Sequence, residues 1–115
     1  MSEDCIFCRI ARGELGTPFV AESEHNVAFR DLAPQAPIHV LVVPRRHMTA
    51  LQDAVPGHAD VVADALTLAT EVARQAGLLE SGYRVITNDG PDAGQTVPHL
   101  HFHVLGGATL QAGLG

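Results

Sequence analysis

The chain has 115 residues, of which 46% are hydrophobic, and carries a formal net charge of −6. This length suits one compact domain spanning residues 1–115. All seven basic residues are arginine and no basic cluster exceeds Arg45–Arg46, which argues against a nucleic-acid partner. Because the acidic start MSEDCIFCRI lacks a secretory signal and no run of about 18 apolar residues follows, we expect a cytoplasmic protein without a membrane span.

The only cysteines, Cys5 and Cys8, form a C-x-x-C motif at the start of the chain. Such a motif in a chain without a signal peptide indicates a reducing compartment, and metal or redox chemistry in place of a structural disulfide. Two small half-buried side chains without any ligand are the plain alternative.

The first half of the chain predicts a short helix followed by three strands. The helix spans residues 5–12 and holds the two cysteines close together. Strands at 18–22 and 26–30 flank a turn-like Ser-Glu-His sequence. The stretch IHVLVV at 38–43 is dense in β-branched residues, which predicts a strand with a buried face that ends at Pro44.

The second half predicts one long helix and two more strands. Residues 57–76 carry a broad apolar stripe and a polar side that would face solvent, which predicts a helix, and Gly77 is a natural helix C-cap. A strand follows at 83–87, then a Gly-, Asp- and Pro-rich loop at 88–96, and a last strand at 99–105. The order predicts an α+β domain, with about five antiparallel strands, one long helix covering one face, and one short helix. The sheet edges need cover, so we expect a homodimer that extends the sheet.

The last strand contains PHLHFHVLGG, with histidines at 99, 101 and 103. Side chains alternate along a strand, so the imidazoles would stand in a row about 6–7 Å apart while Leu100, Phe102 and Val104 anchor the core. Pro98 has no N–H and suits the first residue of a strand, so the strand should begin there.

Two kinds of chemistry need such a row of histidines. The rings can ligate a metal with an open position for water, or a neutral imidazole can attack phosphorus while its neighbours hold the tautomer and protonate the leaving group. The preceding loop offers glycines and backbone N–H groups that can cradle a phosphate, which favours covalent catalysis.

The form HLHFHVL resembles the motif of the histidine triad superfamily of nucleotide hydrolases and transferases, and CIFCRI, AFRDLAPQAPIHVLVVPRRH and GQTVPHLHFHVLGG extend the resemblance over most of the chain. PQAPIHVLVVP with HVLGG resembles the nucleoside-phosphoramidate (Hint-type) branch, whereas DGPDAGQTV is equally similar to the fragile-histidine-triad branch, which cleaves dinucleoside polyphosphates. The tail ATLQAGLG lacks the aromatic residues common in phosphoramidate members, which leaves the preferred leaving group open.

The resemblance implies roles for matching positions. His101 would be the nucleophile that forms a nucleotidyl-histidine, and His103 would contact the phosphate and help in proton transfer. Thr96 would donate to the bridging atom of the leaving group, and His39 would join the site only if its strand shares the histidine face. Asp31 would accept from the ribose hydroxyls. The nucleotide would be bound by Ile6, Phe7, Ile10, Phe29, Asp31, Leu32, Asn88, Gly94, Gln95, Thr96, Val97, His101 and His103, with Leu15 beside the base.

In some members of this superfamily the cysteine pair is completed by two histidines, which here are His47 and His99. The set Cys5, Cys8, His47 and His99 would form a tetrahedral structural zinc site that ties the first helix to the sheet. No catalytic cofactor is expected.

The leading hypothesis is a purine-nucleotide hydrolase that cleaves phosphoramidates or related nucleotidyl esters through His101 and releases a nucleoside monophosphate of the AMP or GMP type. The alternatives are a dinucleoside polyphosphate hydrolase, a nucleotide-binding regulatory domain with incidental turnover, and a histidine-rich metallohydrolase.

Overall fold

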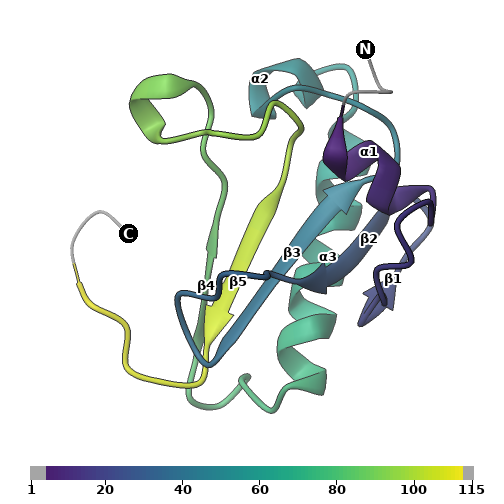
Figure 1. The fold of residues 1–115 in the computed structure, drawn as a ribbon. Coiled ribbons are helices and arrows are strands. Elements are labelled where there is room, and N and C mark those ends of the chain that lie inside the picture. The colour runs from purple at the N-terminus through teal and green to yellow at the C-terminus, as the bar shows by residue number, and fades with distance from the viewer. Residues whose placement is uncertain (1–4, 113–115) are drawn as a thin grey trace.

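The computed structural model describes residues 5–112 and shows a curved sheet between helices (Figure 1). The strands are β1 (Ala21–Glu22), β2 (Asn26–Arg30), β3 (Ile38–Pro44), β4 (Tyr83–Ile86) and β5 (Phe102–Gly106). The helices are α1 (Ile6–Ala11), α2 (Leu51–Ala54) and α3 (Ala59–Gln75), with one 3₁₀ turn at Pro91–Ala93. Residues 1–4 and 113–115 of the predicted domain lie outside the described part.

The five strands form one sheet in the order β1-β2-β3-β5-β4, and every neighbouring pair is antiparallel. After α3 the chain forms the edge strand β4. It then turns back and forms β5, so the histidine strand lies between β3 and β4. The predicted α+β fold with five antiparallel strands is confirmed. The dimer that would extend this sheet stays a prediction.

The two faces of the sheet bury separate apolar cores. The long helix α3 packs on one face, where its buried stripe meets alternate residues of β2, β3 and β5. The short helix α1 lies on the opposite face (Figure 1), where Phe7 and Ile10 pack against Phe29, Leu41 and Val43. Alternation along each strand therefore divides its side chains between the two cores, and the α1 face is the one that holds the candidate site.

The predicted helix at 57–76 is shorter in the structure, and an additional helix, α2, precedes it. α2 has only four residues, too few for a periodic pattern. It is held by contacts that sequence does not show: Asp53 accepts from the Ala50 amide at 3.2 Å, and Asp89 accepts from the Gln52 amide at 2.9 Å.

The prediction that β5 begins at Pro98 or His99 is wrong, because ladder pairing starts at Phe102, opposite Val42 of β3. The His39 carbonyl accepts from the Asp31 amide, so the main-chain groups of His39 point toward the β2 side. Main-chain groups alternate along a strand, so every second residue from the next one to Pro44 points its groups toward β5. Pro44 has no N–H to offer Leu100. The Pro44 carbonyl accepts from His99 Nε2, and the Leu100 amide donates to the Met48 carbonyl at 2.7 Å.

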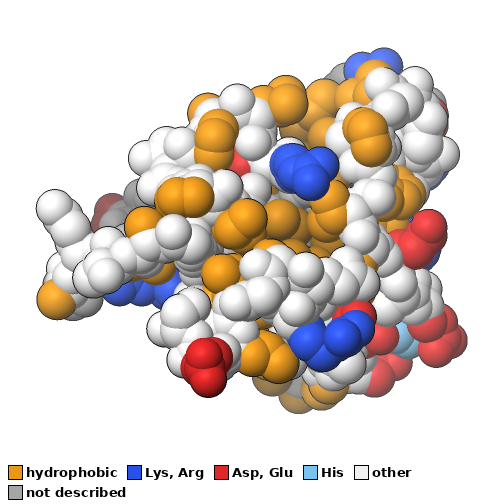
Figure 2. Space-filling model, turned by 90° about the horizontal axis from the view of Figure 1, so that it is seen from below, with side chains coloured by type: hydrophobic (Ala, Val, Ile, Leu, Met, Phe, Trp, Pro, Cys, Tyr) orange, Lys and Arg blue, Asp and Glu red, His pale blue; other side chains and the backbone are white. Residues whose placement is uncertain are grey.

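On the face seen in Figure 2, arginine side chains lie apart from one another among apolar and acidic ones. Within residues 5–112, no helix combines the length and the apolar character needed to cross a bilayer.

Candidate active site and metal site

The histidine row keeps its alternation although only His103 belongs to a paired strand. Leu100, Phe102 and Val104 are buried in the core under α3. His99 and His101 are buried on the α1 side, where the Phe7 ring meets both of them edge-on at centroid distances of 5.9 and 5.2 Å. The apolar residues therefore anchor the segment so that its imidazoles face α1.

His101 is held by a main-chain hydrogen bond from its own ring. Its Nδ1 donates to the His99 carbonyl at 2.7 Å, and the Thr87 hydroxyl fixes the His101 carbonyl at 2.7 Å. Because Nδ1 carries the proton of the neutral ring, Nε2 keeps its lone pair. His101 is thus arranged as a nucleophile.

His39 and His103 form a second pair whose tautomers follow from the hydrogen bonds around them. The Gln35 amide donates to His39 Nδ1 at 3.0 Å, so the neutral His39 ring carries its proton on Nε2. That Nε2 lies 2.9 Å from His103 Nδ1 and 3.4 Å from an Asp31 carboxylate oxygen. His103 Nδ1 therefore accepts, and its proton is on Nε2, which is free to donate.

The His103 ring stays neutral over a wide pH range. Burial, helped by the neighbouring rings of His101 and His39 and opposed by Asp31, lowers its pKa to about 4. A neutral His103 is able to donate a hydrogen bond to an acceptor without adding a charge to the site.

The four predicted metal ligands lie together between α1 and the segment before β5. Their ligand atoms are all within 4.8 Å of one another. Cys5 Sγ lies 3.1 Å from His99 Nδ1, and Cys8 Sγ lies 3.2 Å from His47 Nδ1 and 3.4 Å from His99 Nδ1. Two thiols and two imidazoles at this spacing suit a tetrahedral zinc ion, whose bonds are about 2.0–2.3 Å long.

Hydrogen bonding distinguishes this group from the other cluster of possible ligands, Asp31, His39 and His103. His99 Nε2 donates to the Pro44 carbonyl at 3.0 Å, which leaves its Nδ1 lone pair facing the sulfurs. Metal-binding histidines make this outward bond to a carbonyl. In the second cluster the inward nitrogen of His39 carries a proton, so the cluster is satisfied by hydrogen bonds alone.

The pKa values around the cysteines describe the cluster without a cation. Burial of Cys8, a hydrogen bond with Cys5 and the charge of the Cys5 thiolate raise the pKa of Cys8 to about 11. Burial lowers the pKa of His99 to about 4, against the opposing bond to Pro44. A metal ion binding here must therefore displace thiol protons but finds a neutral imidazole.

The apolar residues predicted for the base divide into buried and exposed groups. Phe7, Ile10 and Phe29 are buried in the α1 core, with the two phenylalanine rings 5.7 Å apart. Ile6 and Leu15 are exposed by about two-fifths, and Leu32 is 99% exposed. Leu32 directly follows Asp31, whose other carboxylate oxygen accepts from the Ala33 amide at 2.8 Å.

The predicted phosphate loop lies between β4 and β5, and Gln95 is hydrogen-bonded within it. Its side chain accepts from the Gly90 amide and donates to the Thr49 and Val97 carbonyls, and its own amide donates to Gly90. Gln95 therefore braces the loop with every donor engaged. Gly94 adopts a positive φ of 88°, Thr96 is exposed and Val97 is half-buried.

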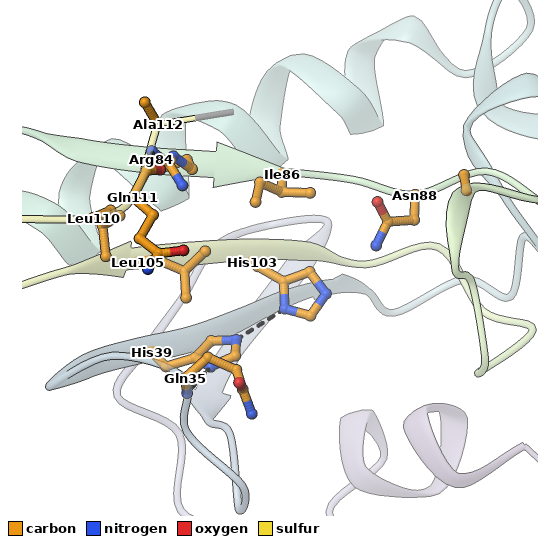
Figure 3. A pocket seen from close by; sticks show the side chains of 11 residues that line it. Gln35, His39, Arg84, Ile86, Asn88, His103, Leu105, Leu110, Gln111 and Ala112 are labelled. Carbon is orange, nitrogen blue, oxygen red and sulfur yellow. Dashed lines mark hydrogen bonds between the residues drawn. The ribbon is translucent and has the colours of Figure 1, made fainter. Parts of the chain in front are cut away.

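A cavity of about 690 Å³ opens beside the histidine pair, between β4, β5 and the C-terminal segment (Figure 3). His39, His103 and Asn88 line it, together with Arg84 and Gln111, which sequence reasoning did not select. Thr87 and Arg84 act through contacts with His101 and Gln111, which are 14 and 27 residues away, and no motif marks them. Gln35 lies within PQAPIHVLVVP, only four residues before His39, but the contact of its amide with the His39 ring depends on the turn between them.

A five-stranded antiparallel sheet that presents paired histidines beside a glycine-rich loop defines the class of histidine triad proteins. The family model described as HIT domain matches residues 12–110. The chain belongs to the HIT domain family.

Three relatives illustrate the similarity. The purine nucleoside phosphoramidase of Escherichia coli K12 is 38% identical over 110 residues, covering 96% of this chain and 92% of that protein. The 14 kDa zinc-binding protein of Zea mays is 44% identical over 107 residues, covering 91% and 83%. A solved HIT family hydrolase from Clostridium thermocellum superposes with a TM-score of 0.92 at 40% identity, covering 97% of each chain. The chain thus groups with hydrolases, and the zinc-binding relative together with the Cys5, Cys8, His47 and His99 cluster supports a structural zinc site.

Proposed function

We propose that the protein is a purine-nucleotide hydrolase that cleaves nucleoside phosphoramidates or related nucleotidyl esters through a covalent intermediate on His101. The hydrogen bond from His101 Nδ1 to the His99 carbonyl carries the proposal, because it presents an unprotonated Nε2 at a site without a competing use for it. The phosphoramidase among the relatives supports the substrate class.

The reaction has two steps. His101 Nε2 attacks the α-phosphorus, the P–N or P–O bond to the leaving group breaks, and the leaving group takes a proton from His103 Nε2–H or the Thr96 hydroxyl. Water then attacks the nucleotidyl-histidine, the P–N bond to His101 breaks, and a nucleoside monophosphate is released. One water molecule is consumed for each bond cleaved.

His39 acts in this scheme as a positioning residue for His103. Fixed by the Gln35 amide and Asp31, it donates to His103 Nδ1 and so keeps the His103 proton on the outward nitrogen. Asp31 retains lone pairs for the ribose hydroxyls. The backbone amides of the loop around Gly94 and Thr96 and the Asn88 amide would bind phosphate oxygens, and Phe7 with Ile6 would form one wall for the purine.

Zinc and dimerisation belong to the same proposal as structural elements. Zinc held by Cys5, Cys8, His47 and His99 would tie α1, and with it Phe7, to the segment that carries His101. The edge strand β4, with Val85 36% exposed, would pair with a second copy. Sedimentation over a range of concentrations measures that pairing.

The test is to mix the protein with an adenosine phosphoramidate, quench at short times, and measure the intact mass. We expect a mass increase of one adenylyl group on His101 in the wild type, and its loss in His101→Ala together with a fall in kcat of several orders of magnitude.

His25→Gln is the matched control, because His25 is a half-buried histidine on the β1–β2 turn, far from the row in sequence and on the α3 side. It should retain wild-type turnover. An adduct on another residue, or near-normal turnover by His101→Ala, would contradict the covalent mechanism.

A further inference from the structure

The cavity beside His103 extends beyond the groups that the proposed hydrolysis uses. One end is formed by His39, His103 and Asn88, and the other by Arg84 and the C-terminal residues Leu110 and Gln111 (Figure 3). The first end holds the donors for the phosphate. The second end lies farther along β4 and β5, where the group attached to that phosphate would extend.

Arg84 faces this cavity because of strand register. It pairs with Leu105, and Ile86 pairs with His103, so the side chains of all four lie on the same face of the sheet. Arg84 and His103 are diagonal neighbours across β4 and β5, a spacing of about 7–8 Å between backbones that a long side chain spans.

The guanidinium of Arg84 has donors left over. Its Nη2 donates to the Gln111 carbonyl at 2.8 Å, and a guanidinium offers five N–H groups. Four other arginines, at positions 9, 12, 45 and 74, form ion pairs with glutamates. Within residues 5–112, Arg84 has no carboxylate in ion-pair distance.

The lining of the cavity has no negative charge to balance this cation. Its described residues include amides, two neutral imidazoles and apolar side chains, but no aspartate or glutamate. A half-buried arginine that lines a cavity attracts an anion more strongly than a fully exposed one, since fewer waters screen it. This is a cationic pocket in a chain whose net charge is −6.

We infer that Arg84 selects substrates whose leaving group carries an anionic group, a carboxylate or a phosphate. The inference rests on the proposed function, since it assigns the far end of the same site. The guanidinium would bind the anion while His103 and the loop hold the α-phosphate, so the reacting bond lies between the two anchors. Arg84 would then be a specificity-determining residue for the leaving group.

The test compares matched substrates. Adenosine phosphoramidates of β-alanine and of β-alanine methylamide differ only in the charge at the far end, and diadenosine tetraphosphate supplies a phosphate there. We expect the wild type to prefer the carboxylate over the amide by roughly tenfold or more in kcat/KM, and Arg84→Met to lose that preference while keeping turnover of the neutral amide.

Two controls separate this idea from a structural effect. Arg84→Lys should restore part of the preference, and Arg74→Met, which removes an exposed arginine on α3, should leave it unchanged. If Arg84→Met lowers turnover of the charged and neutral substrates equally, or the wild type shows no preference for either anion, the inference is wrong. A preference limited to one arm identifies the anion as carboxylate or phosphate.

Binding of the same compounds to His101→Ala, measured by calorimetry, tests Arg84 independently of turnover. A preference for the anionic compounds that disappears on adding Arg84→Met supports the inference even if no adduct forms on His101. Equal affinities in that background overturn it even if the covalent mechanism holds.

Discussion

Removal of the metal should lower the stability of the protein by a measurable and limited amount. The change is Cys8→Ser, or addition of a chelator to the wild type. Cys8 is 2% exposed and its sulfur contacts both histidines of the cluster. A serine oxygen there is a far weaker zinc ligand than a thiolate, so the variant should hold little zinc.

The expected size follows from linkage and from the position of the cluster. A ligand at 100–1,000 times its Kd stabilises the folded state by about 2.7–4.1 kcal/mol. In a domain of this size that corresponds to a fall in Tm of about 10–15 °C on removal. The protein should still fold without metal, because Phe7 and Ile10 anchor α1 in its own apolar core.

Thermal unfolding with and without chelator, beside metal analysis of the purified protein, measures the effect. The wild type should contain about one zinc per chain and lose stability with chelator, and Cys8→Ser should start at the lower Tm and not respond. A metal-free preparation as stable as a zinc-loaded one would refute the reasoning. So would a chelator response of equal size in Cys8→Ser.

Further predictions concern acid stability and packing. In chelated protein, burial holds the pKa of His99 and His103 at about 4, below the ordinary 6.5, so the unfolded chain binds more protons between these values and stability falls as pH drops from 6.5 toward 4. Urea unfolding at about pH 7.5 and about pH 5 measures this loss, and His103→Gln should reduce it; a flat profile would argue against the buried neutral rings. Leu100→Ala, at a side chain 1% exposed, should cost about 2–5 kcal/mol in the same assay, whereas Leu79→Ala, at a side chain 51% exposed, should cost little. Asp64→Ala should cost about 1–3 kcal/mol without changing turnover, since hydrogen bonds from Ser23, Asn26 and the His25 amide to Asp64 hold the β1–β2 turn against α3. Those same bonds lower the pKa of Asp64 despite burial, which acts to raise it. Asp60→Ala, at an exposed residue, is the control. Equal unfolding midpoints for the two variants would show that Asp64 does not hold the β1–β2 turn.

The fold was predictable wherever local pattern and tertiary packing agree. IHVLVV and YRVIT have β-branched residues that suit buried strands, and α3 carries a continuous apolar stripe, so these elements match within a few residues. The start of β5 was not predictable from PHLHFHVL, because ladder pairing ends where a proline of another strand lacks an N–H. The helix α2 depends on Asp89, which lies 37 residues away.

The candidate site divides in the same way. The period-two spacing was enough to expect the histidines on one face, and the structure brings His39 to His103 because β3 and β5 share that face. The tautomers were beyond sequence reasoning, since they are set by the Gln35 amide and the His99 carbonyl. The place of Gln95 in the loop was enough to expect it beside the phosphate, but its hydrogen bonds to Gly90 and Thr49 were not predictable.

Residue 99 supports both halves of the site with different parts of itself. Its ring faces the sulfurs, while its main-chain oxygen accepts a hydrogen bond from the His101 ring. Any amino acid supplies that oxygen. A variant with another side chain at position 99 would therefore lose a zinc ligand but could still orient the His101 ring. The proposed metal binding and the proposed covalent intermediate should therefore be separable by mutation, although residue 99 would contribute to both.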